Sequence, residues 1–489
     1  MNYNAVLWPV ASLTLVSLLC SPASAADEPG RRLFGAPVVE APELSEQEQA
    51  ERRADFEAML EERGWQVQGD VVGPAELFAA PDPQATQAAE WQYEPHRATI
   101  FLNFFGGPMT PGTNSAKMQS TCLKGGTLEY PGFNGTEAQA LAIIETFQSQ
   151  LAPYGVRLAY EQAPPPELPY AMVMMGGTPG LLGMQNGVLG VSCSSDCGDR
   201  WWRDATFAFT AAASASQTNT LATTALHEAA HAFGLAHIDK SFNSGYIMHP
   251  YVDQKPRVWA QDCIGYNDAT GGINCQSTHD IFCGGGAQNT HAELLAYFGV
   301  NGPDTEAPTV SILTPTDGQE LPAGTDISIE ADITDNFEGV GWKLLIYQDG
   351  NLIDERPAFV FERKWGFSKL PAGTYRFVVQ AIDHDRNIGA DEVTVFVGNA
   401  TPETGSDTDS TGGTDGTGGT GGTGGTGDTA GTGGVTGVTG GTAGATDTAT
   451  DTAGIDEDDG CGCTSAPRPA DSLWLLTGLL GLFARRRRR

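Results

Sequence analysis

Eleven consecutive residues, His-Glu-Ala-Ala-His-Ala-Phe-Gly-Leu-Ala-His, constrain this chain more than any other feature of its sequence. His227 and His231 are four residues apart, so on a helix both imidazoles project from one face toward a single point, with Glu228 beside them. Gly234 can take the left-handed backbone conformation that ends a helix sharply. The chain can then turn back and bring His237 to the same point. The sequence therefore predicts a metal site with His227, His231 and His237 as ligands.

The expected chemistry of this site follows from its ligands. Three neutral imidazoles suit Zn²⁺ and leave a fourth position for water, whose pKa the ion lowers toward ~7. Glu228 is placed to act as the general base on that water. Histidines exposed on a helix by coincidence are the alternative, but coincidence does not explain Gly234 and His237 at the required spacing. Four histidines lack ligand-like spacing and are expected to be exposed or to form structural hydrogen bonds: His96, His279, His291 and His384. His249 lies in the turn beside the site and is not counted as a ligand.

The surrounding residues predict a compact domain of the α/β (α+β) class. A strand is expected first, followed by a helix with Leu141, Ile144, Phe147 and Leu151 on its apolar face. Four further strands precede a helix that is rich in Ala and Leu, lacks Gly and Pro, and carries the first two histidines. In chain order, these elements are expected at 98–104, 136–151, 156–161, 170–175, 187–193, 205–210 and 217–233.

The histidine pattern, with a methionine after it, resembles the metzincin clan of metallopeptidases. Met248 lies eleven residues after His237, where this clan has a Met-turn beneath the metal. The residues after Met248 match no single metzincin family. The resemblance covers roughly residues 95–300 and implies a zinc endopeptidase with a mixed five-stranded sheet, an active-site helix and substrate bound along an edge strand, for which 187–193 is the candidate. It also makes Tyr251 a candidate oxyanion or metal contact, with packing as the alternative role.

Several features predict export. Residues 5–20 are almost uninterrupted apolar, and small residues follow at 23–25, so 1–25 are expected to be a signal peptide. The net charge of −33 opposes binding to nucleic acid. An even number of cysteines lies between the signal and the tail, which favours three disulfides over a second metal site and leaves the pairing open. These cysteines are Cys122, Cys193, Cys197, Cys263, Cys275 and Cys283.

Residues 26–92 lie between the signal peptide and the metal-site domain. Ser45 opens a capping-box sequence before the apolar Phe56 and Met59, and Gly64 is expected to end that helix. Two interpretations stay open: an inhibitory propeptide, or a spacer with an accessory helix. Inhibition by this segment would not use a thiolate, because the segment contains no cysteine.

Residues 303–399 differ in pattern from the preceding domain. Short alternating runs, separated by turns such as Asp349-Gly350, predict an all-β sandwich of about seven strands. Residues 370–375 and 381–383 resemble bacterial immunoglobulin-like modules. Its Asp-containing loops have a composition suited to calcium but no EF-hand spacing. The strands are expected at 309–313, 326–333, 342–348, 359–364, 373–382 and 392–397.

The remaining chain predicts a linker and a sorting segment. Residues 400–460 are dominated by Thr, Gly and Asp without Lys or Arg, so a disordered linker is expected. Residues 461–489 combine Cys461 and Cys463, a short apolar run and five terminal arginines. That order resembles the myxobacterial sorting signal MYXO-CTERM, which implies sorting at one of these cysteines and association with the membrane or cell surface. The apolar run, 473–484, is shorter than the ~20 residues of a comfortable membrane span.

The main expectation is a secreted or surface-anchored zinc metalloendopeptidase. Its catalytic domain would be 93–302, its cofactor Zn²⁺ and its substrates proteins or peptides, hydrolysed by a zinc-activated water with Glu228 as general base. The alternative is a cell-surface adhesin in which the sandwich binds a partner and the metal domain is structural or inactive. An intact Glu228 favours the enzyme.

Overall fold

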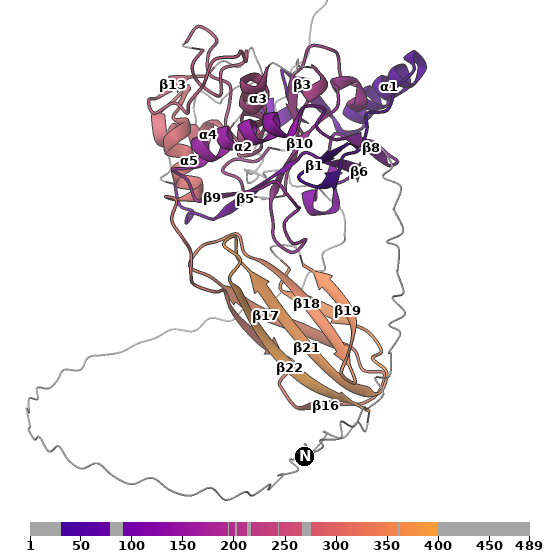
Figure 1. Cartoon of the computed structure of the whole chain (residues 1–489). Coiled ribbons are helices and arrows are strands. Elements are labelled where there is room, and N and C mark those ends of the chain that lie inside the picture. Colours follow the sequence, from indigo (N-terminus) through magenta and orange to yellow (C-terminus); the bar gives the residue numbers. More distant parts are fainter. Residues whose placement is uncertain are drawn as a thin grey trace, which may run out of the picture. The chain divides into compact units, whose positions relative to one another are not determined.

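The computed structural model describes residues 31–78, 91–193, 195–200, 203–212, 217–242, 244–266, 275–358 and 362–398 (Figure 1). The predicted signal peptide, the linker and the tail with Cys461 and Cys463 lie outside these ranges. Among the described helices, none is both long and apolar enough to cross a membrane. The described chain comprises a mixed α/β region followed by an all-β region.

A seven-stranded sheet forms the centre of the α/β region. The pairs β5–β9, β5–β10, β10–β12 and β4–β11 are parallel, whereas β3–β4 and β11–β12 are antiparallel. The five expected strands are present, but the expected size of the sheet was wrong, because an N-terminal hairpin adds two strands beside β11. Across the sheet the order is β3 (Trp65–Gln68), β4 (Val71–Pro74), β11 (Gly190–Ser192), β12 (Ala205–Ala208), β10 (Ala171–Met175), β5 (Ala98–Asn103) and β9 (Val156–Ala159).

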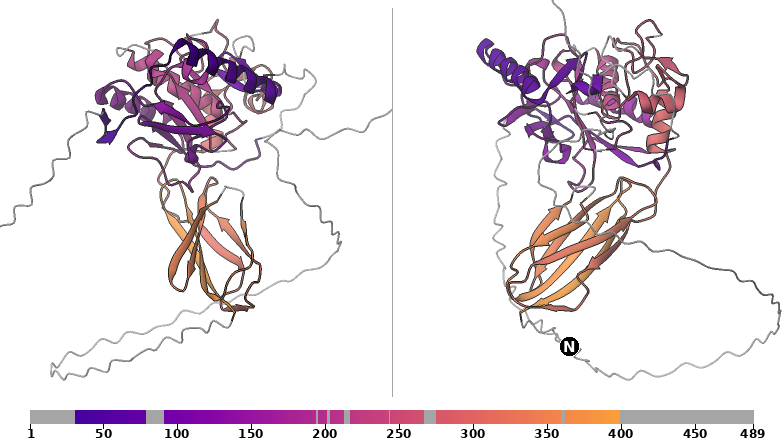
Figure 2. Two further views of the ribbon diagram at one scale, coloured as in Figure 1. Left: turned by 90° about the vertical axis from the view of Figure 1, so that its right-hand side faces the viewer. Right: turned by 180° about the vertical axis from the view of Figure 1, so that it is seen from behind.

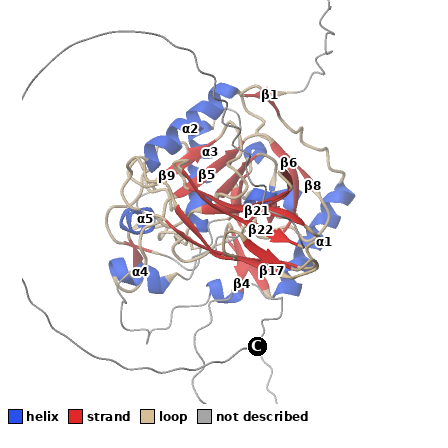
Figure 3. Cartoon of the chain, turned by 90° about the horizontal axis from the view of Figure 1, so that it is seen from below, coloured by secondary structure: helices blue, strands red, loops and turns tan. Residues whose placement is uncertain are grey.

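The strands alternate their side chains between two cores, as the two-residue period of a strand requires. Ile100 and Leu102 of β5 belong to one core, together with apolar residues of α2 (Glu137–Leu151), α3 (Thr218–Ala232) and α5 (Thr290–Phe298). Phe101 belongs to the other core, which also includes Phe56 and Met59 of α1 (Glu46–Arg63). The sheet is therefore covered on both faces (Figure 3).

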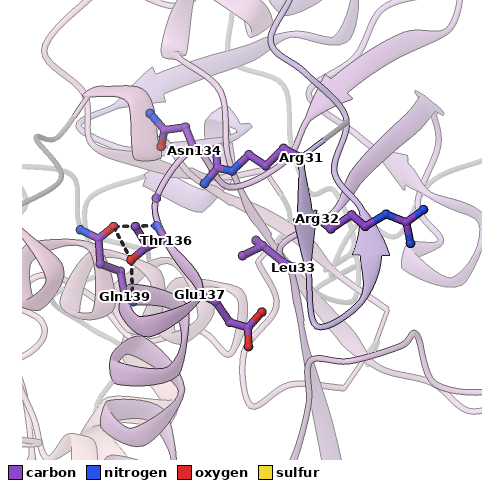
Figure 4. Close-up of a pocket in the computed structure, with 8 residues that line it drawn as sticks. Arg31, Arg32, Leu33, Asn134, Thr136, Glu137 and Gln139 are labelled. Carbon is purple, nitrogen blue, oxygen red and sulfur yellow. Dashed lines mark hydrogen bonds between the residues drawn. The ribbon is translucent and has the colours of Figure 1, made fainter. Parts of the chain in front are cut away.

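Capping residues set the helix boundaries that the sequence predicts. Ser45 forms the capping box of α1, and Gly64 ends that helix with φ of 64°. Thr136 and Gln139 form a second capping box at the start of α2 (Figure 4). The expected burial of Leu141 was wrong, because it lies about 100° around the helix from the buried Ala140 and is 43% exposed.

Short elements connect these parts. The remaining elements of the α/β region are β1 (Arg32–Leu33), β2 (Ala36–Pro37), η1 (Ala75–Phe78), β6 (Gly106–Pro111), η2 (Ser115–Lys117), β7 (Gln119–Ser120), β8 (Leu128–Pro131), η3 (Pro179–Leu182), η4 (Thr210–Ala212), β13 (Ile264–Gly265), α4 (Gln276–Cys283) and β14 (Ala287–Gln288).

The all-β region is a sandwich of a three-stranded and a five-stranded sheet (Figure 2). Apolar residues of both sheets form one core. The sequence missed β16 and β19, and the expected strand at 359–364 begins instead at Lys364, with 359–361 outside the described residues. The strands are β15 (Thr309–Thr314), β16 (Gln319–Leu321), β17 (Ile327–Thr334), β18 (Gly341–Gln348), β19 (Asn351–Pro357), β20 (Lys364–Phe367), β21 (Gly373–Ile382) and β22 (Ile388–Val397).

All six cysteines of the α/β region are paired, which confirms the expected three disulfides. The bonds are Cys122–Cys193, Cys197–Cys275 and Cys263–Cys283. The first closes a loop of 71 residues and the second a loop of 78 residues. Closing loops of this length restricts the unfolded chain and stabilises the folded one by ~4 kcal/mol each in the chain-entropy model.

Candidate metal centre

Three histidine side chains converge at the end of α3. The Nε2 atoms are 2.9 Å apart between His227 and His237, 3.0 Å between His227 and His231, and 3.1 Å between His231 and His237. Nitrogens bound to one tetrahedral zinc at ~2.0–2.1 Å would lie ~3.3 Å from one another. The spacing of the three nitrogens therefore fits a shared ion.

Backbone carbonyls orient two of these rings. The Nδ1–H of His227 donates to the carbonyl oxygen of Ile247, and that of His231 to the carbonyl oxygen of Leu235, both at 2.7 Å. Because a carbonyl can only accept, each neutral ring carries its proton on Nδ1 and turns an unprotonated Nε2 inward. Two unprotonated nitrogens cannot hydrogen-bond to each other, so their convergence calls for a cation.

Burial keeps His227 and His231 neutral. The side chains of His227, His231 and His237 are at most 2% exposed. Burial lowers the pKa of His227, and burial with the neighbouring histidine lowers the pKa of His231 to about 4. The two rings are thus in the metal-binding form at neutral pH.

Asp70 is a fourth member of the cluster, and sequence reasoning missed it. Its Oδ1 lies 3.1 Å from Nε2 of His237 and 3.5 Å from Nε2 of His231, and its Oδ2 lies 3.5 Å from Nε2 of His227. Three histidines and one carboxylate thus form a set that could hold a metal ion.

The position of Asp70 follows from a short hairpin. Gly69 takes a positive φ of 62°, so the chain turns tightly after β3 and continues into β4. The backbone N–H of Ser192 donates to the carbonyl oxygen of Asp70 at 2.9 Å, and Ser192 pairs with Val71. The Gly-Asp pair between two apolar runs indicated a turn, but nothing local indicated that this turn meets residues more than a hundred positions away.

The same hairpin pairs with β11, the strand expected from the sequence at the edge of the sheet. Strand β11 lies between β4 and β12 rather than at the edge of the sheet. The expectation that 187–193 is an open edge was therefore wrong for this structure, because residues before the expected domain supply it with a parallel backbone partner.

Glu228 lies beside β11. It is 1% exposed, and its Oε2 has no hydrogen-bond partner among the described residues. A Cβ atom added at Gly190 would lie 2.4 Å from Oε1 of Glu228, so the carboxylate packs directly against the strand backbone. Burial raises the pKa of Glu228 well above its usual range, and the nearby charge of Asp70 raises it further.

Gly190→Ala is expected to displace the Glu228 carboxylate without removing a metal ligand. Misplacing a reacting group by ~1 Å can reduce turnover by ~10²-fold. We therefore expect unchanged metal content and a comparable loss of any hydrolytic activity, measured by elemental analysis and peptide turnover. Gly125→Ala is the matched control, since no atom lies within 4 Å of a Cβ there. Full activity of Gly190→Ala would contradict this placement of Glu228.

The turn after α3 brings in His237. Gly234 has φ of 95°, and a Cβ there would lie 2.4 Å from the carbonyl oxygen of Asp196 and 3.1 Å from Sγ of Cys275. The turn therefore packs directly against the Cys197–Cys275 disulfide. A side chain at position 234 would strain the backbone, because φ is positive there, and its Cβ would clash with the Asp196 carbonyl oxygen.

Met248 is 1% exposed and packs in the same core as residues of α3. Its carbonyl oxygen accepts from the backbone N–H of Ile238, next to His237. The preceding residue, Ile247, accepts from His227. The segment around Met248 is thus hydrogen-bonded to His227 and to Ile238, the residue after His237.

Tyr251 lies apart from the cluster in its described contacts. Its side chain is 61% exposed and its ring contacts His249. The other histidines have hydrogen-bond partners away from the metal site, as expected. These pairs are His96–Asp199, His279–Glu293, His291–Tyr154, His384–Thr99 and His249 with the Lys240 carbonyl.

A surface pocket near α2 is separate from this cluster. Figure 4 shows its lining side chains, among them Arg31, Arg32 and Glu137. It contains none of the clustered histidines and no second cluster of metal-ligating groups. We assign it no role in the metal centre.

Comparison with known families identifies one region of the chain. Residues 308–379 match the bacterial Ig domain family Big_7. This match covers the sandwich up to β21 but not β22, and together with the disulfides it indicates an extracytoplasmic protein. The comparison with curated proteins found no match.

Solved structures resemble only part of the chain. Fibronectin(III)-like modules of CbhA from Clostridium thermocellum are 22% identical, with 19% of this chain and 47% of that chain covered and a TM-score of 0.16. The PKD domain of human KIAA0319 is 19% identical over 22% of this chain and 96% of that chain, with a TM-score of 0.15. Matches at this level carry no argument about function.

Proposed function

We propose that this chain is an exported zinc-dependent endopeptidase. We further propose that its N-terminal segment, residues 26–92, keeps the enzyme inactive. The observation that carries the proposal is the convergence of three buried histidine nitrogens, two of them turned inward by backbone carbonyls. A set of nitrogens with one carboxylate suits Zn²⁺ better than Ca²⁺ or Mg²⁺, which prefer oxygen. The resemblance to metzincins supports the same function.

His227, His231 and His237 would hold the ion, which when bound lowers the pKa of water and polarises a carbonyl. Glu228 would accept the proton from the attacking water and pass it to the leaving amine. Its burial beside β11 supports this role, because the carboxylate is shielded from bulk water and its Oε2 has no hydrogen-bond partner among the described residues. Peptide substrates would lie extended along β11, where backbone pairing supplies affinity.

Asp70 and β4 support the latent state. The carboxylate of Asp70 lies where a fourth ligand or water would otherwise be, and β4 occupies the backbone edge that a substrate would use. Asp70 also raises the pKa of Glu228, which disfavours the ionised base. The N-terminal segment would therefore have to leave before the enzyme acts.

The test is peptide hydrolysis by a chain with a specific protease site placed within 79–90. We expect cleavage of casein or a quenched peptide after that site is cut, loss of activity with a zinc chelator and recovery with added Zn²⁺. His237→Ala, which lacks one ligand, is the control and should stay inactive. An activated wild type that binds the metal but cleaves none of these substrates would contradict the proposal.

The second candidate function is adhesion, which the bacterial Ig domain favours. Retention at the cell surface through residues 461–489 belongs to both candidates. Adhesion would persist in the chelated protein, whereas peptidase activity would not. Binding to cells that is unchanged by chelator, without any hydrolysis, would favour the adhesin.

A further inference from the structure

A second group of potential ligands lies in the sandwich. One carboxylate oxygen each from Asp304, Asp335 and Asp383 lies within 4.8 Å of the others. Asp304 precedes β15, Asp335 follows β17 and Asp383 follows β21, so three separate segments meet here. None of these residues belongs to the histidine centre.

These carboxylates are shielded from water. Asp304 is 7% exposed and Asp383 is 2% exposed, and both carboxylate oxygens of the half-buried Asp335 are inaccessible. Burial and the two neighbouring aspartates raise the pKa of Asp335 to about 6. Three buried acids this close repel one another, and a cation among them would remove that cost.

Carboxylate oxygens of Asp304 and Asp335 remain free for such a cation among the described residues. Asp304 Oδ1 accepts from the backbone N–H of Glu306 at 3.1 Å and from Asn336 Nδ2 at 3.0 Å. Asp304 Oδ2 is buried and has no hydrogen-bond partner among the described residues. Asn387 donates to both oxygens of Asp383, through its backbone N–H at 2.8 Å and through Nδ2 at 2.7 Å. An unpartnered carboxylate oxygen on a residue this buried points to a missing ligand.

We propose that Asp304, Asp335 and Asp383 bind one calcium ion. An all-oxygen set of three carboxylates without histidine or cysteine suits a hard cation, and irregular loops suit the flexible coordination of Ca²⁺ better than the strict octahedron of Mg²⁺. Arg97 and Arg386 interact electrostatically with Asp304 and Asp383, so the local charge is partly balanced. A moderate affinity, typical of extracellular modules with ~10⁻⁴–10⁻³ M dissociation constants, is expected.

The ion would order loops that also contact the α/β region. Next to Asp335, the ring of Phe337 lies 3.8 Å from the guanidinium carbon of Arg97. Next to Asp383, Nδ1 of His384 accepts from the hydroxyl of Thr99 at 2.8 Å. Calcium binding would thus stabilise both the end of the sandwich and its contacts with the metal-site region.

The test measures calcium binding and thermal unfolding of the full-length, zinc-loaded chain in calcium-depleted buffer. We expect about one Ca²⁺ per chain by calorimetry and a Tm that rises by several degrees at millimolar Ca²⁺. Asp335→Asn and Asp383→Asn should lose the calcium-dependent rise. Without calcium, Asp335→Asn should be at least as stable as wild type, because it relieves repulsion, a result that a merely structural aspartate would not give.

Asp332→Asn is the matched control, since this exposed aspartate of β17 is outside the cluster and should leave calcium binding unchanged. His237→Ala should also retain calcium binding, which separates this site from the histidine centre. Absence of binding at 10-fold above millimolar Ca²⁺, equal stabilisation by Mg²⁺, or a full calcium response in the double variant Asp335→Asn/Asp383→Asn would each overturn the proposal.

Discussion

The Glu228→Ala variant is expected to keep about one zinc per chain and to lose most of its peptidase activity. The histidines that would hold the ion stay in place, while the group that would move the proton is removed. General-base groups typically contribute ~10²- to 10⁴-fold. The measurement is zinc by elemental analysis beside turnover of casein or a quenched peptide, with the N-terminal segment removed.

Glu228→Asp provides the sharper comparison, because it keeps the charge and shortens the side chain. We expect little recovery, since Gly190 fixes how closely the longer carboxylate packs against β11. His231→Ala is the opposite control and should lose zinc as well as activity. Near-full activity of Glu228→Ala would remove the glutamate from the mechanism.

Asp70→Ala is expected to activate the uncut chain. The carboxylate lies within 3.5 Å of a nitrogen of each of the three histidines and would take the fourth position on a shared ion. Losing a group that holds or supports a metal typically changes site properties by roughly 10- to 100-fold. Removing Asp70 should also lower the pKa of Glu228 toward its usual value, because Asp70 is one of the causes of the upward shift. Hydrolysis by the intact Asp70→Ala chain should therefore exceed that by intact wild type by about tenfold or more.

Asp55→Ala is the matched control, because Asp55 is an exposed acid of α1 in the same N-terminal segment. It should leave latency unchanged. If Asp70→Ala stays as inactive as wild type while the cut chain is active, β4 alone accounts for latency. If both intact chains are already fully active, the segment is a spacer.

The sequence predicted the features that depend on residues close together in the chain, namely helix boundaries, strands and the spacing of the histidines. The capping residues Ser45 and Thr136 predicted two helix starts, and the apolar periods predicted β5, β10 and β21. The histidine spacing predicted that His227, His231 and His237 would lie together. Helix boundaries and strand alternation depend on neighbours within a few residues, which the sequence displays directly.

Contacts between segments far apart in the chain could not be predicted from these local patterns. Asp70 reaches the histidines only because β4 pairs with β11, and that pairing depends on one long-range backbone register. The three aspartates of the sandwich are likewise brought together by turns that follow different strands. The exposure of Leu141 shows the limit within a single helix, because position on the apolar face is decided by what packs against it.

The Cys197–Cys275 disulfide packs behind Gly234, so the support of His237 depends on the redox conditions of the compartment in which the chain folds. In a thiol-reducing cytoplasm, Cys197 and Cys275 would not be bonded, and the turn that presents His237 would lose the covalent link behind it. A newly made chain would then hold His237 less firmly than the two histidines on α3. Under the proposed function, the cell that makes this enzyme is protected by oxidation state as well as by the N-terminal segment, since the disulfide that supports the third ligand forms only after export.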